Sequence, residues 1–136
     1  MFLINNHSDL YFEKTACFGR CPAFKFIWKE GADLELTITQ PFNEGPLSSL
    51  QPGTFTGTTT PGQARKYIQS VIESAKLCQY NSLDDEYDNP RVTDLPATIT
   101  EINGKRVKVR YGGPDLNNLY SALQIILDET SWAPTE

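Results

Sequence analysis

The sequence predicts an α+β domain in which two amphipathic helices pack on one face of a mostly antiparallel sheet. Apolar residues alternate with polar ones over several short segments of the first half, which is the period of a half-buried strand. Two longer segments carry apolar residues at helical spacing. We therefore expect the order four strands, helix, two strands, helix (β-β-β-β-α-β-β-α), in a single domain over residues 1–136.

The first three strands should form one antiparallel unit. Alternation is seen in residues 10–16, where Leu10, Phe12 and Ala16 share a side, and again in residues 24–29 and 34–39. The last two segments should pair as a hairpin, because only a short turn at 30–33 separates them. The side chains expected on its buried face are Phe24, Phe26, Trp28, Leu34, Leu36 and Ile38.

A loop and an edge strand are predicted before the first helix. Residues 41–53 contain three prolines and two glycines, which indicates a long loop, and the threonine-rich residues 54–59 favour a short edge strand. Thr60 suits the N-cap position and Pro61 the first helical position. The apolar face that follows predicts a helix over residues 61–77.

The second half begins with an acidic stretch, residues 79–96, which two prolines interrupt. Asn103-Gly104 is then the two-residue turn typical of a tight hairpin, here joining residues 97–102 to 105–111. With this turn Glu101 should face Arg106 across the two strands.

The second helix should open at Gly112-Gly113-Pro114, because an apolar stripe at helical spacing follows these residues. The stripe consists of Leu116, Leu119, Tyr120, Leu123, Ile126 and Leu127. We expect the tail from residue 131 onward to be loose, with Trp132 as the side chain that could pack inward.

Composition and charge narrow the class of partner. The chain is acidic, with a net charge of −5, which disfavours nucleic acid and anionic lipid surfaces. No apolar run is long enough for a transmembrane segment. The first four residues lack the basic and long apolar segments of a signal peptide, so we expect none in this chain.

The cysteines admit three interpretations. Cys17 and Cys21 flank a glycine-containing turn that can bring their Cα atoms close enough for a disulfide, which would leave Cys78 as a free, largely buried thiol. Thiols packed as small apolar groups are the second interpretation. A zinc site is the third, but it would need four ligands, and nothing in the sequence brings His7 and Cys78 to the turn. A Cys17–Cys21 disulfide is our working hypothesis, and it would require an oxidising compartment.

The acidic stretch supplies the candidate ligand residues. Asp84, Asp85, Asp88 and Asp94 could contribute oxygens to a cation, although the spacing does not match an EF-hand. A solvated acidic loop is the alternative, with Asp94 fixing the entry to the next strand. A nucleophile–base pair would have to use His7, the single histidine, so we predict no catalytic residue, no metal and no cofactor.

Three motifs together resemble a bacterial family. They are Thr15-Ala16-Cys17-Phe18-Gly19-Arg20-Cys21-Pro22, Val92-Thr93-Asp94-Leu95-Pro96-Ala97-Thr98 and Tyr111-Gly112-Gly113. With the hairpin from Ala23 to Thr39, the chain resembles the domain of unknown function 6438 family over about residues 10–130. The resemblance carries over no catalytic residue. It implies a cell-envelope or periplasmic location, since many members look exported or lipid-anchored, and it implies that the cysteine turn matters to the fold.

The sequence therefore favours a non-enzymatic protein-interaction module with an unidentified protein partner. Free sheet edges and residues 41–53 are the expected contact surfaces. The alternative is a domain that binds a cation or small molecule, or an enzyme, through the acidic loop at residues 84–94.

Overall fold

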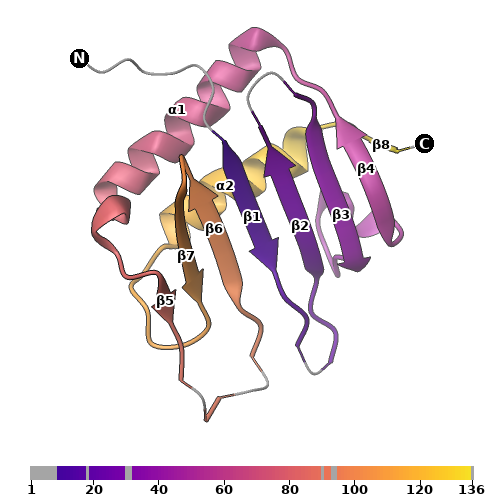
Figure 1. The fold of residues 1–136 in the computed structure, drawn as a ribbon. Coiled ribbons are helices and arrows are strands. Elements are labelled where there is room, and N and C mark those ends of the chain that lie inside the picture. Colours follow the sequence, from indigo (N-terminus) through magenta and orange to yellow (C-terminus); the bar gives the residue numbers. More distant parts are fainter. Residues whose placement is uncertain (1–8, 18, 30–31, 90, 93–94, 136) are drawn as a thin grey trace.

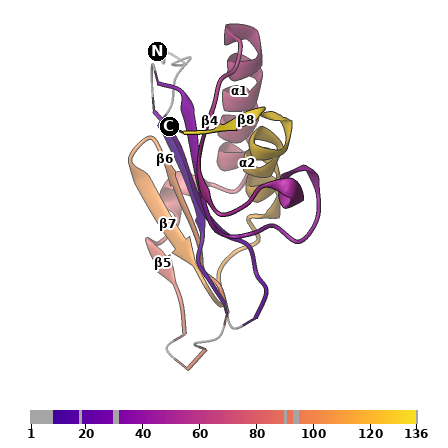
Figure 2. The same ribbon diagram turned by 90° about the vertical axis from the view of Figure 1, so that its right-hand side faces the viewer.

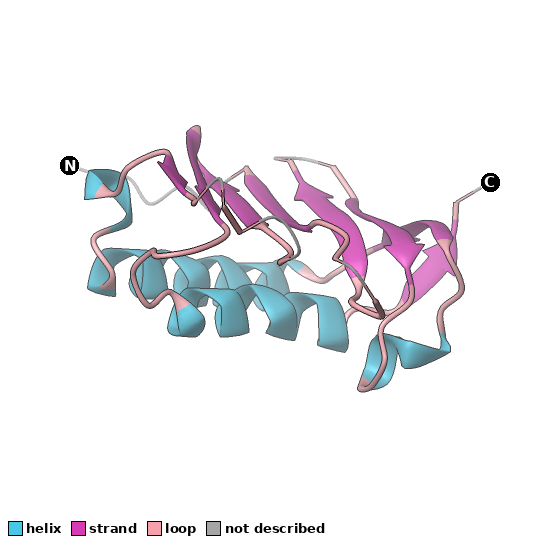
Figure 3. Ribbon diagram, turned by 90° about the horizontal axis from the view of Figure 1, so that it is seen from below, coloured by secondary structure: helices cyan, strands magenta, loops and turns pink. Residues whose placement is uncertain are grey.

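The computed structural model describes residues 9–17, 19–29, 32–89, 91–92 and 95–135, which form two layers (Figure 1). One layer is a β-sheet, and the other is a pair of long helices against the same sheet face (Figures 2 and 3). The strands are β1 (Leu10–Lys14), β2 (Ala23–Trp28), β3 (Leu34–Gln40), β4 (Gly53–Gly57), β5 (Glu86–Tyr87), β6 (Thr98–Ile102), β7 (Lys105–Val109) and β8 (Trp132–Pro134). The helices are α1 (Pro61–Leu77) and α2 (Asn117–Glu129), with short 3₁₀ turns η1 (Pro46–Ser49) and η2 (Tyr80–Ser82).

The predicted α+β class is confirmed, but the predicted strand order is wrong. Along the chain, the prediction lacks the two short strands β5 and β8. Within the sheet, the described strands lie side by side in the order β5-β7-β6-β1-β2-β3-β4-β8. β5 runs parallel to β7, which makes the sheet mixed, while the other described pairings are antiparallel. Strands of two or three residues are too short to show a period in the sequence.

The C-terminal tail forms the edge of the sheet, contrary to the expected loose end. β8 pairs with β4, so β4 is not the edge strand that was predicted. The indole N–H of Trp132 donates to the carbonyl of Leu127, 2.9 Å away, and the amide of Thr135 donates to the carbonyl of Thr54. These bonds attach the tail to α2 on one side and to the sheet on the other.

The predicted hairpin of β2 and β3 is confirmed, and its apolar face is the centre of the core. Phe24, Phe26 and Trp28 are all buried, as are Leu34, Leu36 and Ile38. β1 lies between β2 and β6 and buries Leu10 and Phe12 in the same layer. β1 ends at Lys14, however, so Ala16 is exposed instead of continuing the buried side.

Both helices cover this apolar face. α1 has the predicted bounds, and the hydroxyl of Thr60 accepts a hydrogen bond from the amide of Gln63, as an N-cap should. α2 begins at Asn117, later than expected, and its predicted stripe is buried except for the half-buried Tyr120. In the part of the chain that is described, neither helix combines the length and apolarity that crossing a membrane requires.

The hairpin of β6 and β7 forms around the predicted turn. Asn103 and Gly104 have φ angles of 51° and 89°, the left-handed conformations that a tight two-residue turn needs. Glu101 faces Arg106 as expected, with 3.3 Å between carboxylate and guanidinium. β7 ends at Val109, two residues before the predicted end of the strand.

Candidate functional site

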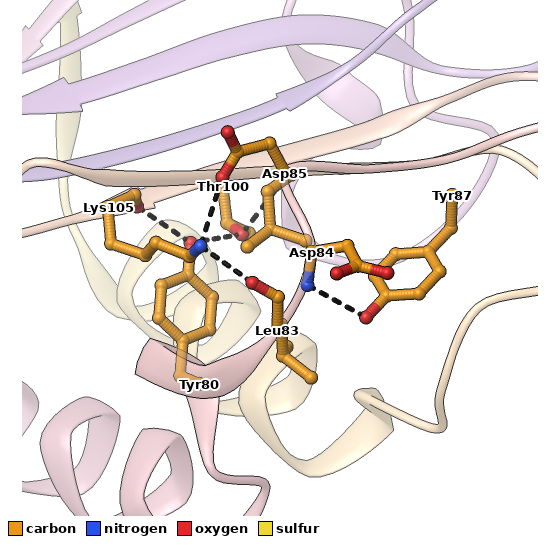
Figure 4. Close-up of polar contacts among 8 residues, drawn as sticks. Tyr80, Leu83, Asp84, Asp85, Tyr87, Thr100 and Lys105 are labelled. Carbon is orange, nitrogen blue, oxygen red and sulfur yellow. Dashed lines mark hydrogen bonds and ion pairs between the residues drawn. The ribbon is translucent and has the colours of Figure 1, made fainter.

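The acidic loop lies along the edge of β7, next to the basic side chains of Lys105 and Lys108 in this strand and of Arg110 just after it. Asp85 Oδ1 is 3.0 Å from Lys105 Nζ, and this ammonium group also donates to the carbonyl of Leu83 at 2.6 Å (Figure 4). Glu86 Oε2 lies 4.0 Å from Lys108 Nζ, and Asp88 Oδ2 lies 3.1 Å from Arg110 Nη1. Three carboxylates of the loop are thus paired with two cations of β7 and with Arg110, the residue that follows this strand.

Backbone and tyrosine contacts hold the same loop in place. The amides of Lys108 and Arg110 donate to the carbonyls of Asp85 and Tyr87, which forms the parallel β5–β7 pairing. The amide of Asp84 donates to the hydroxyl of Tyr87 at 2.9 Å (Figure 4). The loop therefore forms an edge strand over Glu86–Tyr87, and its preceding residues are held by these contacts.

Tyr80 anchors the start of this loop in the core. Its hydroxyl lies 2.8 Å from Thr100 Oγ1 and donates to the carbonyl of Lys105 at 3.0 Å. Burial raises the pKa of the Tyr80 phenol to about 12, so the hydroxyl remains protonated at neutral pH. Tyr80 and Lys105 together connect the loop to both strands of the β6–β7 hairpin.

The predicted cation ligands are only partly brought together. Asp84, Asp85 and Asp88 lie on one short segment, but two of these carboxylates face cations, and Asp94 is outside the described residues. Within the described ranges, no group of three or more His, Cys, Asp or Glu side chains is arranged to hold a metal. One sequence signal could have predicted these ion pairs. The basic run Lys105-Arg106-Val107-Lys108-Val109-Arg110 is opposite in charge to the acidic run at residues 84–88.

The cysteine turn joins β1 to β2. The Cα atoms of Cys17 and Cys21 are 5.9 Å apart, and their sulfur atoms lie at disulfide distance. Cys78 is free and half-buried, less buried than expected, and its thiol donates to the carbonyl of Ala75. Burial raises the pKa of this thiol, which disfavours the reactive thiolate. His7 lies outside the described residues.

The loop at residues 41–53 is folded against the molecule beside the cysteine turn. Phe42 stacks on Phe24 with 5.0 Å between ring centroids, and Leu47 of η1 is buried. The side-chain amide of Asn43 donates to the carbonyl of Arg20 at 2.8 Å. Figure 2 shows that the segment between β3 and β4 projects on the helix side of the sheet, next to α2.

A cleft of about 450 Å³ opens where this loop, the cysteine turn and α2 meet. We call it the cysteine-turn cleft. Its walls include Lys14, Pro22, Phe42, Glu44, Gln124 and Asp128. Its volume falls within the range of about 300–1,000 Å³ that is usual for binding sites in proteins. Residues 41–53 were predicted to be a contact surface, but no sequence pattern indicated that α2 would form a cleft with them.

The cleft combines an aromatic surface with opposite charges. Phe42 is half-buried and Phe24 is buried beneath it. Asp128 Oδ1 accepts a hydrogen bond from the amide of Gln124 at 2.9 Å, and Glu44 is exposed at the rim. Neither carboxylate forms an ion pair with Lys14 among the residues that the structure describes. These charges are available to a ligand.

Fold and site together define a small α+β domain with a cysteine turn beside a preformed cleft. The chain belongs to the family described as Domain of unknown function (DUF6438), whose sequence model matches residues 8–127. This match confirms the family resemblance seen in the sequence. The comparison with curated proteins gave no match, and neither did the comparison with solved structures.

Proposed function

We propose that this domain is a protein-interaction module that holds a segment of a partner protein in the cysteine-turn cleft. The observation that carries the proposal is the composition of the cleft, where aromatic and prolyl side chains are surrounded by polar and charged ones. Protein contact sites have this anatomy, with an apolar centre and a polar rim. In this function the cleft provides binding surface and performs no chemistry.

The rigidity of the cleft favours binding of a partner segment, because its walls are already fixed in the folded domain. The Phe42–Phe24 stack and the buried Leu47 hold the loop on the core, and Asn43 ties it to the cysteine turn. A preorganised surface loses less conformational entropy when a partner binds than a mobile loop does. The sheet edges are weaker candidates, because β5 and β8 are only two and three residues long.

Site-specific crosslinking in the native cells tests the proposal. Glu44, at the rim of the cleft, is replaced by benzoylphenylalanine in the full chain, and the exposed Gln69 on α1 is replaced as a control. We expect irradiation to give a discrete adduct with one protein from position 44 and none from position 69. Excess unmodified chain should suppress that adduct by competition.

The crosslinked partner is then purified, and its affinity is measured for the wild-type chain and for Phe42→Ala. A loss of affinity in this variant, with an unchanged circular dichroism spectrum, supports the cleft as the site. The same adducts from both positions, or none from position 44, would contradict the proposal.

A further inference from the structure

We infer that the partner segment inserts an arginine side chain into the cysteine-turn cleft. The inference rests on the proposed interaction function and names the chemistry that the cleft selects. Three features of the described residues carry it, namely the balance of charge in the cleft, the half-buried ring of Phe42 and the presence of a single lining cation, Lys14.

The charge balance of the cleft favours a cation. Two carboxylates, Glu44 and Asp128, and one ammonium group, Lys14, line it. Asp128 is half-buried, and Gln124 bonds one of its oxygens, which fixes the orientation of the carboxylate. A guanidinium group can form two parallel hydrogen bonds to an oriented carboxylate, and such charge-assisted bonds are among the strongest in proteins.

The aromatic surface favours arginine over lysine. Phe42 packs on Phe24 at an interplanar angle of 27°, so the ring is held flat against the core while it still lines the cleft. A planar guanidinium stacks on such a ring and remains able to bond a carboxylate at its edge. The compact, strongly hydrated ammonium group of lysine gains less from this combination.

Lys14 limits the cleft to one cation. It is paired in register with Phe24 across β1 and β2, and it lines the same cleft as the α2 residues Gln124 and Asp128. A second positive charge in the partner would meet this ammonium group. The net charge of −5 attracts basic segments to the domain as a whole. Among such segments, the cleft should favour those that present a single positive side chain.

A capped peptide with one arginine between two leucines is the direct probe. It is titrated into the uniformly ¹⁵N-labelled full chain, and amide chemical shifts are followed by NMR. We expect saturable shifts confined to residues 14, 22–24, 42–45 and 124–128. The same peptide with citrulline, the neutral isostere of arginine, should bind about tenfold more weakly, because it loses the charge-assisted bond.

Paired variants locate the charge that matters. Glu44→Gln with Asp128→Asn should reduce affinity for the arginine peptide about tenfold and leave citrulline binding unchanged. Glu35→Gln with Glu73→Gln removes the same charge from exposed positions outside the cleft and should have little effect. Lys14→Gln should not weaken arginine binding. A dispersed NMR spectrum shows that each variant is folded.

The outcomes separate this inference from the proposed function. Equal binding of the arginine and citrulline peptides in the cleft would overturn the arginine inference while leaving the cleft as a docking site. Arginine-dependent binding at another surface would overturn it as well. No shifts in the cleft at millimolar peptide would also overturn the inference, whereas the proposed function is judged separately by the crosslink at position 44.

Discussion

The side-chain amide of Asn43 donates a hydrogen bond to the backbone carbonyl of Arg20, 2.8 Å away, although the two residues are 23 positions apart. This bond joins the loop between β3 and β4 to the cysteine turn between β1 and β2. Because Pro22 and Phe42 lie close to its two ends in the sequence, the bond also joins two walls of the cysteine-turn cleft. The cleft thus depends on contacts between segments that are separate in sequence.

The cysteine pair gives the first prediction. If Cys17 and Cys21 form a disulfide in the native protein, alkylation under denaturing conditions without reductant should label Cys78 alone. Mass spectrometry of the labelled chain measures this. Replacing both with serine should lower the free energy of unfolding by about 2 kcal/mol, since the closed loop is short. Three labelled cysteines would contradict the disulfide.

Phe26 tests the position of the core. Its side chain is fully buried in β2, so Phe26→Ala should lower the free energy of unfolding by about 3–5 kcal/mol, measured by urea denaturation. Ile27, the next residue, is half-buried on the opposite sheet face, and Ile27→Ala is the matched control with a smaller loss. A loss below about 1 kcal/mol for Phe26→Ala would mean that the wrong face has been assigned to the core.

The ion pairs along β7 should differ in strength according to their exposure. Asp88 and Arg110 are 17% and 26% exposed, whereas Asp85 is 87% exposed. We expect Asp88→Asn to cost about 1 kcal/mol of stability and Asp85→Asn less than about 0.5 kcal/mol, because water screens exposed pairs. Urea denaturation at low and high salt measures both variants. Equal losses, or the reverse order, would show that exposure does not determine the contribution of these pairs.

Two tyrosines that the fold shields from water, Tyr80 and Tyr120, should make the stability of the protein sensitive to alkaline pH. Burial raises the pKa of Tyr80 and of Tyr120 to about 12, against an ordinary value of 10.0. The folded state holds these protons more tightly, so their stabilisation is full below pH 10 and is lost as the pH rises through 12. The free energy of unfolding should therefore fall over this interval, and phenolate absorbance follows the ionisation. Tyr120→Phe should make the fall shallower.

The exposed Tyr111 provides the control for this pH dependence. Its side chain is 50% exposed, so Tyr111→Phe removes a phenol that the fold leaves in contact with water. If Tyr111→Phe and Tyr120→Phe changed the pH profile equally, burial would not be the cause.

Calcium titration tests the alternative function of the acidic loop. Asp85, Glu86 and Asp88 already face cationic side chains, so a calcium ion would have to displace them. We expect millimolar calcium to change the melting temperature by less than about 1 °C. An increase of several degrees that disappears in Asp85→Asn and in Asp94→Asn would instead support a cation site in this loop.

The elements with local sequence signals could be predicted from the amino-acid sequence. Thr60 and Pro61 mark the start of α1, Asn103-Gly104 specifies the β6–β7 turn, and the alternation around Phe26 identifies the buried side of β2. Each signal depends on the conformations of a few neighbouring residues, which short-range sterics and hydrogen bonds decide. These elements formed as predicted because the local preference and the packing agree.

The sheet edges and the cleft, in contrast, depend on packing between segments that are distant in the sequence. The parallel β5–β7 pairing and the antiparallel β4–β8 pairing join short segments that show no periodicity of their own. The cleft requires α2 to lie beside the loop that carries Phe42, and no pattern within either segment specifies this contact. Such contacts form because packing on the shared core brings distant segments together. A sequence pattern indicates which side chains are apolar, but it does not indicate which side chains they contact.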